Sequence, residues 1–237
     1  MAAVPCSRVQ SRHEPWPRRA RFALSCRSRS ASARRSQRRG RRAIWNSSSS
    51  SAATISYLSV MRIEQPAQRH DGRIVWQPLL LGPIFRALAL ESSPFVLCEE
   101  KGAYVWQDMM RQCRKYGLRW TQPSTFPCLG VQPLRPALLR AEQAWIGAFC
   151  RRVMELNVVL DQDINDPAPM ARILSDLGLP AAELLAQAQS APAKLRLREQ
   201  TELARQNGIS GAPTFFVGTE MVWGNDRRDD ALLLAAG

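Results

Sequence analysis

The chain has 237 residues, of which 45% are hydrophobic and 22% charged, and its formal net charge is +13. The positive charge is local, because residues 1–42 hold thirteen Arg and one acid, Glu14, whereas residues 43–237 are almost neutral. A nucleic-acid-binding domain needs a basic face on a folded body, so this distribution disfavours a nucleic-acid partner. The sequence also lacks an apolar run of about 18 residues, so no membrane span is expected.

Residues 1–53 form an Arg- and Ser-rich leader that ends in a run of serines, Ser47–Ser51. Apolar residues show no period of 3.6 or 2 in it, so we predict disorder. Two interpretations stay open. Such an acid-poor leader is typical of an organellar transit peptide, which implies mitochondria. The favoured alternative is an out-of-frame translation of a GC-rich coding sequence, which implies a bacterial cytoplasm.

Ordered structure is predicted from about Ile55. Apolar residues of 55–70 recur at roughly helical spacing, and Pro66 is expected to kink or end this helix. Residues 73–80 are a β-type run after Gly72. A strand is expected just before the first helix, but Ser and Ala occupy that place, so the first strand is predicted to be degenerate and its neighbours unpaired.

The middle of the chain is predicted to be helical after a loop at residues 83–98. The expected helices are Gly102–Tyr116, Pro136–Leu156, Pro167–Leu177, Ala181–Gln189 and Ala193–Gln206. Asp166 is a typical N-cap before a proline, and Gly178 and Gly208 are typical helix stops. Two β-type runs and a last helix follow. This order predicts an α/β protein with a mixed sheet and a helical insertion.

The first β-type run of the C-terminal hairpin begins on Pro213, after Gly211 and Ala212. Proline can open an edge strand because it has no N–H to pair. A strand that begins on proline after Gly-Ala also resembles the thioredoxin superfamily, in which that X-Pro bond is cis. A cis bond would turn the backbone N–H and C=O of Ala212 toward a ligand that pairs like an added strand. We therefore predict a cis bond between Ala212 and Pro213.

Several motifs occur in the order typical of one family. They are "SYLS" at 56–59, "WQPLLLGPIF" at 76–85, "SPF" at 93–95, "KGAY" at 101–104, and "GAPTFFVG" followed by "WGNDR". Residues 54–237 thus resemble the 2-hydroxychromene-2-carboxylate isomerases, close relatives of the kappa-class glutathione transferases. The resemblance implies a DsbA-like thioredoxin fold with a βαβ part at about 54–82, a helical insertion at about 83–207 and a ββα part at about 208–237.

The resemblance also implies a glutathione-dependent isomerase of aromatic catabolism. In that family the glutathione thiolate adds reversibly to a small unsaturated acid derived from an aromatic ring, a bond rotates, and elimination releases the isomer. Free thiols ionise near pH 8–9, so the site must stabilise the thiolate. Homodimers are common in the family, and the cofactor expected here is glutathione.

The family's thiol-facing Ser corresponds to Ala53, so the sulfur-facing hydroxyl is missing. Thr54 and Ile55 stand where the family usually has Pro and Tyr beside glutathione. The loss of one anion-stabilising donor lowers a rate by roughly 10²–10³. We therefore expect impaired activity.

The part of the site that holds the glutathione peptide is more complete. The resemblance implies that Ala212 and Pro213 contact the cysteinyl unit and that Asn225 and Asp226 contact the γ-glutamyl group. An alternative role for Asn225 and Asp226 is to cap the last helix. Glu91 replaces an Asn that contacts the ligand in some members, and that contact is in doubt.

Other functions stay open beside the isomerase. A kappa-like glutathione transferase would use the same site, and a non-catalytic thioredoxin-like module would only bind glutathione or a peptide. A protein disulfide oxidoreductase activity is disfavoured, since no Cys pair begins the first helix. The six cysteines form no C-x-x-C pair and have no His at metal-ligand spacing, so no metal is expected.

Overall fold

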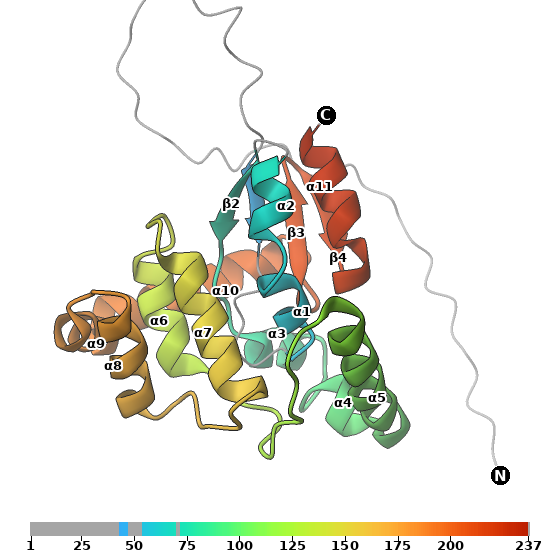
Figure 1. The fold of residues 1–237 in the computed structure, drawn as a ribbon, viewed down its shortest axis with the longest axis horizontal. Helices are drawn as coiled ribbons and strands as arrows, with labels where there is room; N and C mark the ends of the chain where they lie inside the picture. Colours follow the sequence, from blue (N-terminus) through green and yellow to red (C-terminus); the bar gives the residue numbers. More distant parts are fainter. Residues whose placement is uncertain (1–42, 47–53, 70–71, 237) are drawn as a thin grey trace, which may run out of the picture. The chain divides into compact units, whose positions relative to one another are not determined.

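The computed structural model describes the backbone of residues 43–46 and, with their side chains, residues 54–69 and 72–236. Within these residues four short strands form a sheet in the order β2-β1-β3-β4 (Figure 1). The strands are β1 (Ala43–Asn46), β2 (Arg73–Trp76), β3 (Thr214–Val217) and β4 (Glu220–Trp223). β1 lies parallel to β2 and antiparallel to β3, and β3 and β4 form an antiparallel hairpin. The predicted mixed sheet is confirmed.

Strand β1 corrects the expectation of a degenerate first strand just before Ile55. It lies earlier, at Ala43–Asn46, and Ile44 pairs with Ile74 of β2 on one side and with Val217 of β3 on the other. Ile and Trp favour strands, but four residues are too few to reveal a period. The neighbouring strands are therefore paired, contrary to expectation.

These four residues fall inside the leader predicted to be disordered. Residues 1–42 and 47–53 lie outside the described residues. The disorder of those residues, the domain boundary at residue 53 and the two interpretations of the leader's origin stay predictions.

Eleven α-helices and one 3₁₀ helix lie in the described residues. They are α1 (Ser56–Val60), α2 (Glu64–Arg69), α3 (Leu81–Ala87), α4 (Pro94–Leu97), α5 (Glu99–Tyr116), α6 (Val131–Leu139), α7 (Ile146–Val158), α8 (Pro167–Asp176), α9 (Ala181–Gln189), α10 (Ala191–Gln206), η1 (Asn225–Arg227) and α11 (Arg228–Ala236). Helices α3 to α10 separate the βαβ part from the ββα part, which confirms the predicted helical insertion.

The two faces of the sheet pack against different helices. Phe215 and Val217 of β3 belong to the main core, which also contains buried side chains of α1, α2 and α11. Phe216, between them, packs on the other side against a smaller cluster that includes Ile84 of α3 and Ala204 of α10. Figure 1 shows α2 and α11 in front of the sheet and α10 behind it. The alternation along β3 is what a strand covered on both faces requires.

Helix boundaries follow local chemistry where the sequence carries clear signals. The Asp166 carboxylate accepts a hydrogen bond from Ala168 N at 2.9 Å, with Pro167 in the first turn, so the predicted start of α8 is confirmed. Gly178 and Gly208 have φ of +72° and +80° just after helices, as expected of helix stops.

Several predicted boundaries were wrong. Residues 83–98 are not a loop, because α3 overlaps them and α4 begins after Ser93, whose side chain accepts from Phe95 N. The single helix expected at Pro136–Leu156 is split into α6 and α7, and Pro136 lies inside α6. The apolar spacing continues through the break, so periodicity cannot reveal it.

The helix expected at 55–70 is also two helices, and Pro66 lies within the first turn of α2 rather than at a kink. The first turn tolerates proline because its N–H groups have no partner inside the helix. Strand β2 ends at Trp76, earlier than the β-type run at 73–80 suggested. In the described part of the chain, no helix combines the length and the apolar character needed to cross a membrane.

Candidate functional site

The entrance to α1 is where the thiol-facing side of the site was expected. Ala53 lies outside the described residues. Thr54 is buried, with 4% of its surface exposed, and its carbonyl accepts from Tyr57 N at 3.1 Å in the first turn. Ile55 is half-buried and serves as the N-cap without a side-chain hydrogen bond.

The turn before β3 is the second part of the candidate site. The Ala212–Pro213 bond is cis, as predicted. Pro213 O accepts from Gly224 N at 2.9 Å, and Thr214 Oγ1 donates to Gly211 O at 2.8 Å, so the protein fixes the turn on both sides. Within the described residues, the N–H and C=O of half-buried Ala212 have no hydrogen-bond partner. They are therefore available to pair with the backbone of a peptide-like ligand.

Gly211 is required beside this turn because the indole of Trp223 packs against it. A Cβ placed on Gly211 would lie 2.9 Å from Nε1 of Trp223, closer than Cβ atoms approach other heavy atoms. A larger residue would displace either the turn or the exposed indole side chain of Trp223. The Gly-Ala-Pro sequence therefore fits this turn for steric reasons as well.

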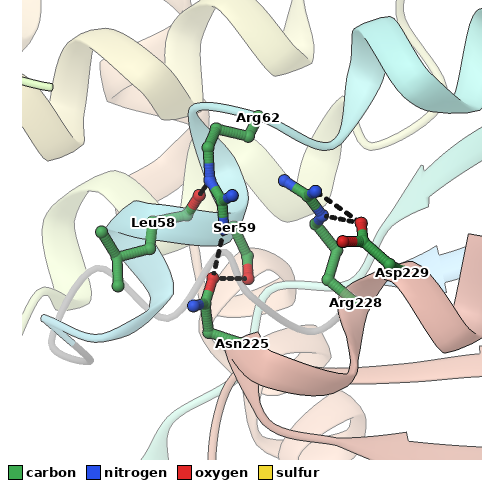
Figure 2. A network of polar contacts seen from close by, with 6 residues as sticks. All are labelled: Leu58, Ser59, Arg62, Asn225, Arg228 and Asp229. Carbon is green, nitrogen blue, oxygen red and sulfur yellow. Dashed lines mark hydrogen bonds and ion pairs between the residues drawn. The ribbon is translucent and has the colours of Figure 1, made fainter. Parts of the chain in front are cut away.

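Asn225 in η1 is tied to α1, as Figure 2 shows. Its Oδ1 accepts from Ser59 Oγ at 3.0 Å and from Arg62 Nη2 at 2.9 Å. Arg62 is fixed in turn, because its Nε donates to Leu58 O at 2.7 Å and its guanidinium lies 3.3 Å from the ring centroid of Tyr116. These contacts hold the η1 turn against the first helix.

Asp226 differs from its neighbour. Its side chain is 78% exposed, and its carboxylate lies 3.7 Å from Nε of Arg227. In the described residues neither Asn225 nor Asp226 accepts a side-chain hydrogen bond from an N–H of α11, so the capping role is not observed. The Asp226 carboxylate is open to solvent and suits a ligand ammonium group, whereas the Asn225 oxygen is occupied by the protein.

Arg228 is a residue of this region that the sequence reading missed. Only 8% of its surface is exposed, and its Nε donates to Asp229 Oδ1 at 2.9 Å (Figure 2). Burial and, next, the charge of Arg228 lower the pKa of Arg62. Two cationic side chains thus approach each other beside the η1 turn. The "WGNDRR" sequence signals the turn, but nothing in it shows which of the two arginines is buried.

Cys113, Cys150 and Tyr57 do not offer a reactive group at neutral pH. Burial raises the pKa of Cys113 to about 11 and that of Cys150 to about 12, so both stay protonated. Burial likewise raises the pKa of Tyr57 to about 12, and its hydroxyl donates to Arg119 O at 2.9 Å. Neither of these two thiols therefore supplies a thiolate nucleophile at neutral pH.

Glu91 and Lys101 are exposed. Trp76 and Phe149 are each 1% exposed and belong to the main core. The structure thus joins η1 to α1 through Asn225, but in the described residues no hydrogen bond joins Thr54 or Ile55 to Ala212.

Comparisons with known proteins agree with this architecture. The chain is 29% identical to the 2-hydroxychromene-2-carboxylate isomerase of Sphingobium xenophagum over 179 residues, which are 73% of this chain and 88% of the relative. A solved 2-hydroxychromene-2-carboxylate isomerase superposes with a TM-score of 0.71 at 22% identity and covers 78% of this chain and 90% of its own.

A more distant structure is the cytosolic disulfide reductase DsbM of Pseudomonas aeruginosa, solved with GSH. It has a TM-score of 0.54 at 14% identity and covers 81% of this chain and 96% of its own. At these identities both structures show the fold alone. The DSBA-like thioredoxin domain matches residues 49–233. Because that match spans most of the chain, the protein belongs to the family of DSBA-like thioredoxin domains.

Proposed function

We propose that this chain is a glutathione-dependent isomerase of the 2-hydroxychromene-2-carboxylate type, with turnover impaired by Ala53. The observation that carries the proposal is the 29% identity that extends over 88% of a relative with that name. The substrate is then a small acid derived from an aromatic ring. The homodimer and the cytoplasmic location stay predictions.

The residues present fit the peptide part of glutathione. Ala212 offers a backbone donor and acceptor without partners in the described residues, which suits the cysteinyl unit. The exposed carboxylate of Asp226 suits the γ-glutamyl ammonium group. Asn225 acts by fixing the η1 turn to α1 rather than by offering its oxygen to the ligand.

The part of the site that would contact the glutathione thiol lacks one hydroxyl group, as the sequence shows. When bound, glutathione supplies a thiol that adds to the unsaturated substrate and later leaves it. A hydroxyl at position 53 would hold the thiolate, but Ala53 has none. Thr54 carries the next hydroxyl along the chain, and that residue is buried. In this proposal the chain's residues bind and orient glutathione, while one hydrogen-bond donor that would stabilise its thiolate is missing.

A second candidate function rests on that missing donor. With Ala53 the same turns would serve a non-catalytic module that binds glutathione or a peptide. A kappa-like transferase would also use these turns, but it needs a stabilised thiolate as much as the isomerase does.

The test is to follow the absorbance of 2-hydroxychromene-2-carboxylate with the purified chain, with and without glutathione, and to measure retention on immobilised glutathione. We expect slow turnover that requires glutathione, together with retention. Retention without turnover, in a chain that is folded by circular dichroism, supports the binding module instead. Absence of both contradicts the two candidates.

A further inference from the structure

A pocket whose lining is about equally polar and apolar lies between two loops of the helical insertion, residues 118–130 after α5 and residues 159–166 between α7 and α8. Its volume is about 330 Å³, at the small end of the roughly 300–1,000 Å³ range of small-molecule pockets. None of the candidate glutathione residues lines it. It is thus a separate site from the one described above.

The two loops are fastened to each other, so the pocket exists before any ligand enters. Ser124 donates to Asp161 Oδ1 from its backbone N at 2.7 Å and from its Oγ at 3.0 Å. Across the pocket, Asn165 Nδ2 donates to Asp163 Oδ1 at 3.1 Å and approaches Cys128 Sγ at 3.6 Å. Such fixed walls favour binding, because little ordering remains to be done.

Asn157 is the most informative residue of the lining. It lies on α7, and only 7% of its surface is exposed. In the part of the chain that the structure describes, its carboxamide has no hydrogen-bond partner. The carboxamide is not among the fully buried side-chain atoms without a partner, so it faces the open space of the pocket. A ligand in the pocket can therefore form the hydrogen bonds that the protein does not supply to it.

The charge of the lining sets the chemistry of that ligand. Asp161 and Asp163 both line the pocket, and its lining includes no Lys, Arg or His. Each uses Oδ1 for contacts within the protein, whereas Oδ2 has no hydrogen-bond partner in the described residues. Burial raises the pKa of the Cys128 thiol, so this side chain adds no charge. The pocket thus offers two carboxylate oxygens to a positively charged donor.

A metal ion is not the ligand that these groups favour. No group of three or more His, Cys, Asp or Glu residues suited to a metal occurs among the residues described. Carboxylates flanked by carboxamides match an organic cation that also carries hydrogen-bonding groups. We propose that this pocket binds a small organic ammonium compound, with the ammonium at Asp161 and Asp163 and a hydroxyl or carbonyl group at Asn157.

The test compares three probes of nearly equal size by calorimetric titration of the full chain: ethanolamine, which is cationic, ethylene glycol, which is neutral, and glycolate, which is anionic. We expect ethanolamine to bind at least about tenfold more tightly than the other two, because hydrogen bonds to charged groups are the strong ones. Equal binding of the three probes, or no binding of ethanolamine, would overturn the proposal.

Two variants locate the binding. Asp163→Asn should weaken ethanolamine binding by about tenfold, while the matched control Asp176→Asn, an exposed carboxylate paired with Arg152, should leave it unchanged. Asn157→Leu should also weaken binding, with a melting temperature close to that of the parent, since no side-chain hydrogen bond within the described residues is lost. Equal effects of Asp163→Asn and Asp176→Asn, or undiminished binding by Asn157→Leu, would refute the assignment.

Discussion

In the proposed function, the hairpin half, which begins at Pro213, and the α1 half, which contains the entrance to α1, hold different parts of the chemistry. The hairpin half has its cis proline, an Ala212 backbone without a hydrogen-bond partner among the described residues, and an exposed carboxylate at Asp226. In the α1 half, the proposal places Ala53 where a hydroxyl-bearing residue would hold the thiolate. On this proposal, the architecture positions a peptide-like ligand independently of the group that activates its thiol.

The largest expected effect concerns the packing of strand β3, in the hairpin half, against the core. Phe215→Ala should lower the free energy of unfolding by about 3–5 kcal/mol, because Phe215 is fully buried against α11 and its removal leaves a cavity. Urea denaturation measures this loss. Phe216→Ala is the adjacent control. Because Phe216 is only half-buried, this substitution should lower the free energy of unfolding clearly less. Equal losses would mean that β3 does not face the core as described.

The role proposed for position 53 in the α1 half is tested by restoring the missing hydroxyl. Ala53→Ser should raise glutathione-dependent turnover by roughly 10²–10³, since one anion-stabilising donor contributes about that much. Glutathione affinity should change little, because the peptide part is held by the hairpin half. Ala52→Ser, the same change one residue earlier, should have no effect on turnover. An equal gain in both variants would contradict the role given to position 53.

The link between the two halves depends on Asn225. Asn225→Ala should lower the free energy of unfolding by about 1–3 kcal/mol, because Ser59 Oγ and Arg62 lose their shared acceptor. Asp226→Ala is the matched control next to it and should cost little stability, since its side chain is exposed. A double-mutant cycle with Ser59→Ala should show coupling. Additive losses of unfolding free energy in the double variant would argue against the hydrogen bond between Ser59 and Asn225.

The smallest effect at neutral pH concerns the chain's own thiols. Cys113 and Cys150 have pKa values of about 11 and about 12 when folded, against about 8.5 for an unfolded thiol. The folded state therefore holds more protons, so this contribution to stability is complete below about pH 8.5 and is lost as the pH rises through the folded pKa values.

Urea denaturation at pH 8, 9 and 10 measures that loss. A variant with both thiols replaced by Ala should show a shallower fall of the free energy of unfolding over this range. Rapid alkylation of Cys113 or Cys150 in the folded chain at pH 8 would contradict their burial and their raised pKa values.

Much of the hairpin half could be predicted from the sequence because its signals are local. Gly218 between two β-type runs marks the turn, and it has φ of +64°. Pro213 after Gly-Ala marks the cis bond, and Asp166 before a proline marks the start of α8. Each of these residues fixes a conformation without distant partners.

The rest depends on contacts between distant parts of the chain. Ala43–Asn46 becomes the central strand because β2 and β3 pair with it on both sides, and a four-residue run carries no period to reveal this. Asn225 contacts Ser59 across the sequence, so its engagement with α1 could not be inferred from the turn alone. The burial of Arg228 follows in the same way from packing.

The most direct test of an intact peptide site without a thiol partner is the pKa of the glutathione thiol when bound to the parent chain. It can be measured by thiolate absorbance during a pH titration, with S-methylglutathione as the reference for binding. We expect both ligands to bind with similar affinity and the bound thiol to ionise near its ordinary pKa of about 8.5. A pKa well below 7, or a strong preference for glutathione over S-methylglutathione, would show that the chain with Ala53 stabilises the thiolate and would contradict the division described here.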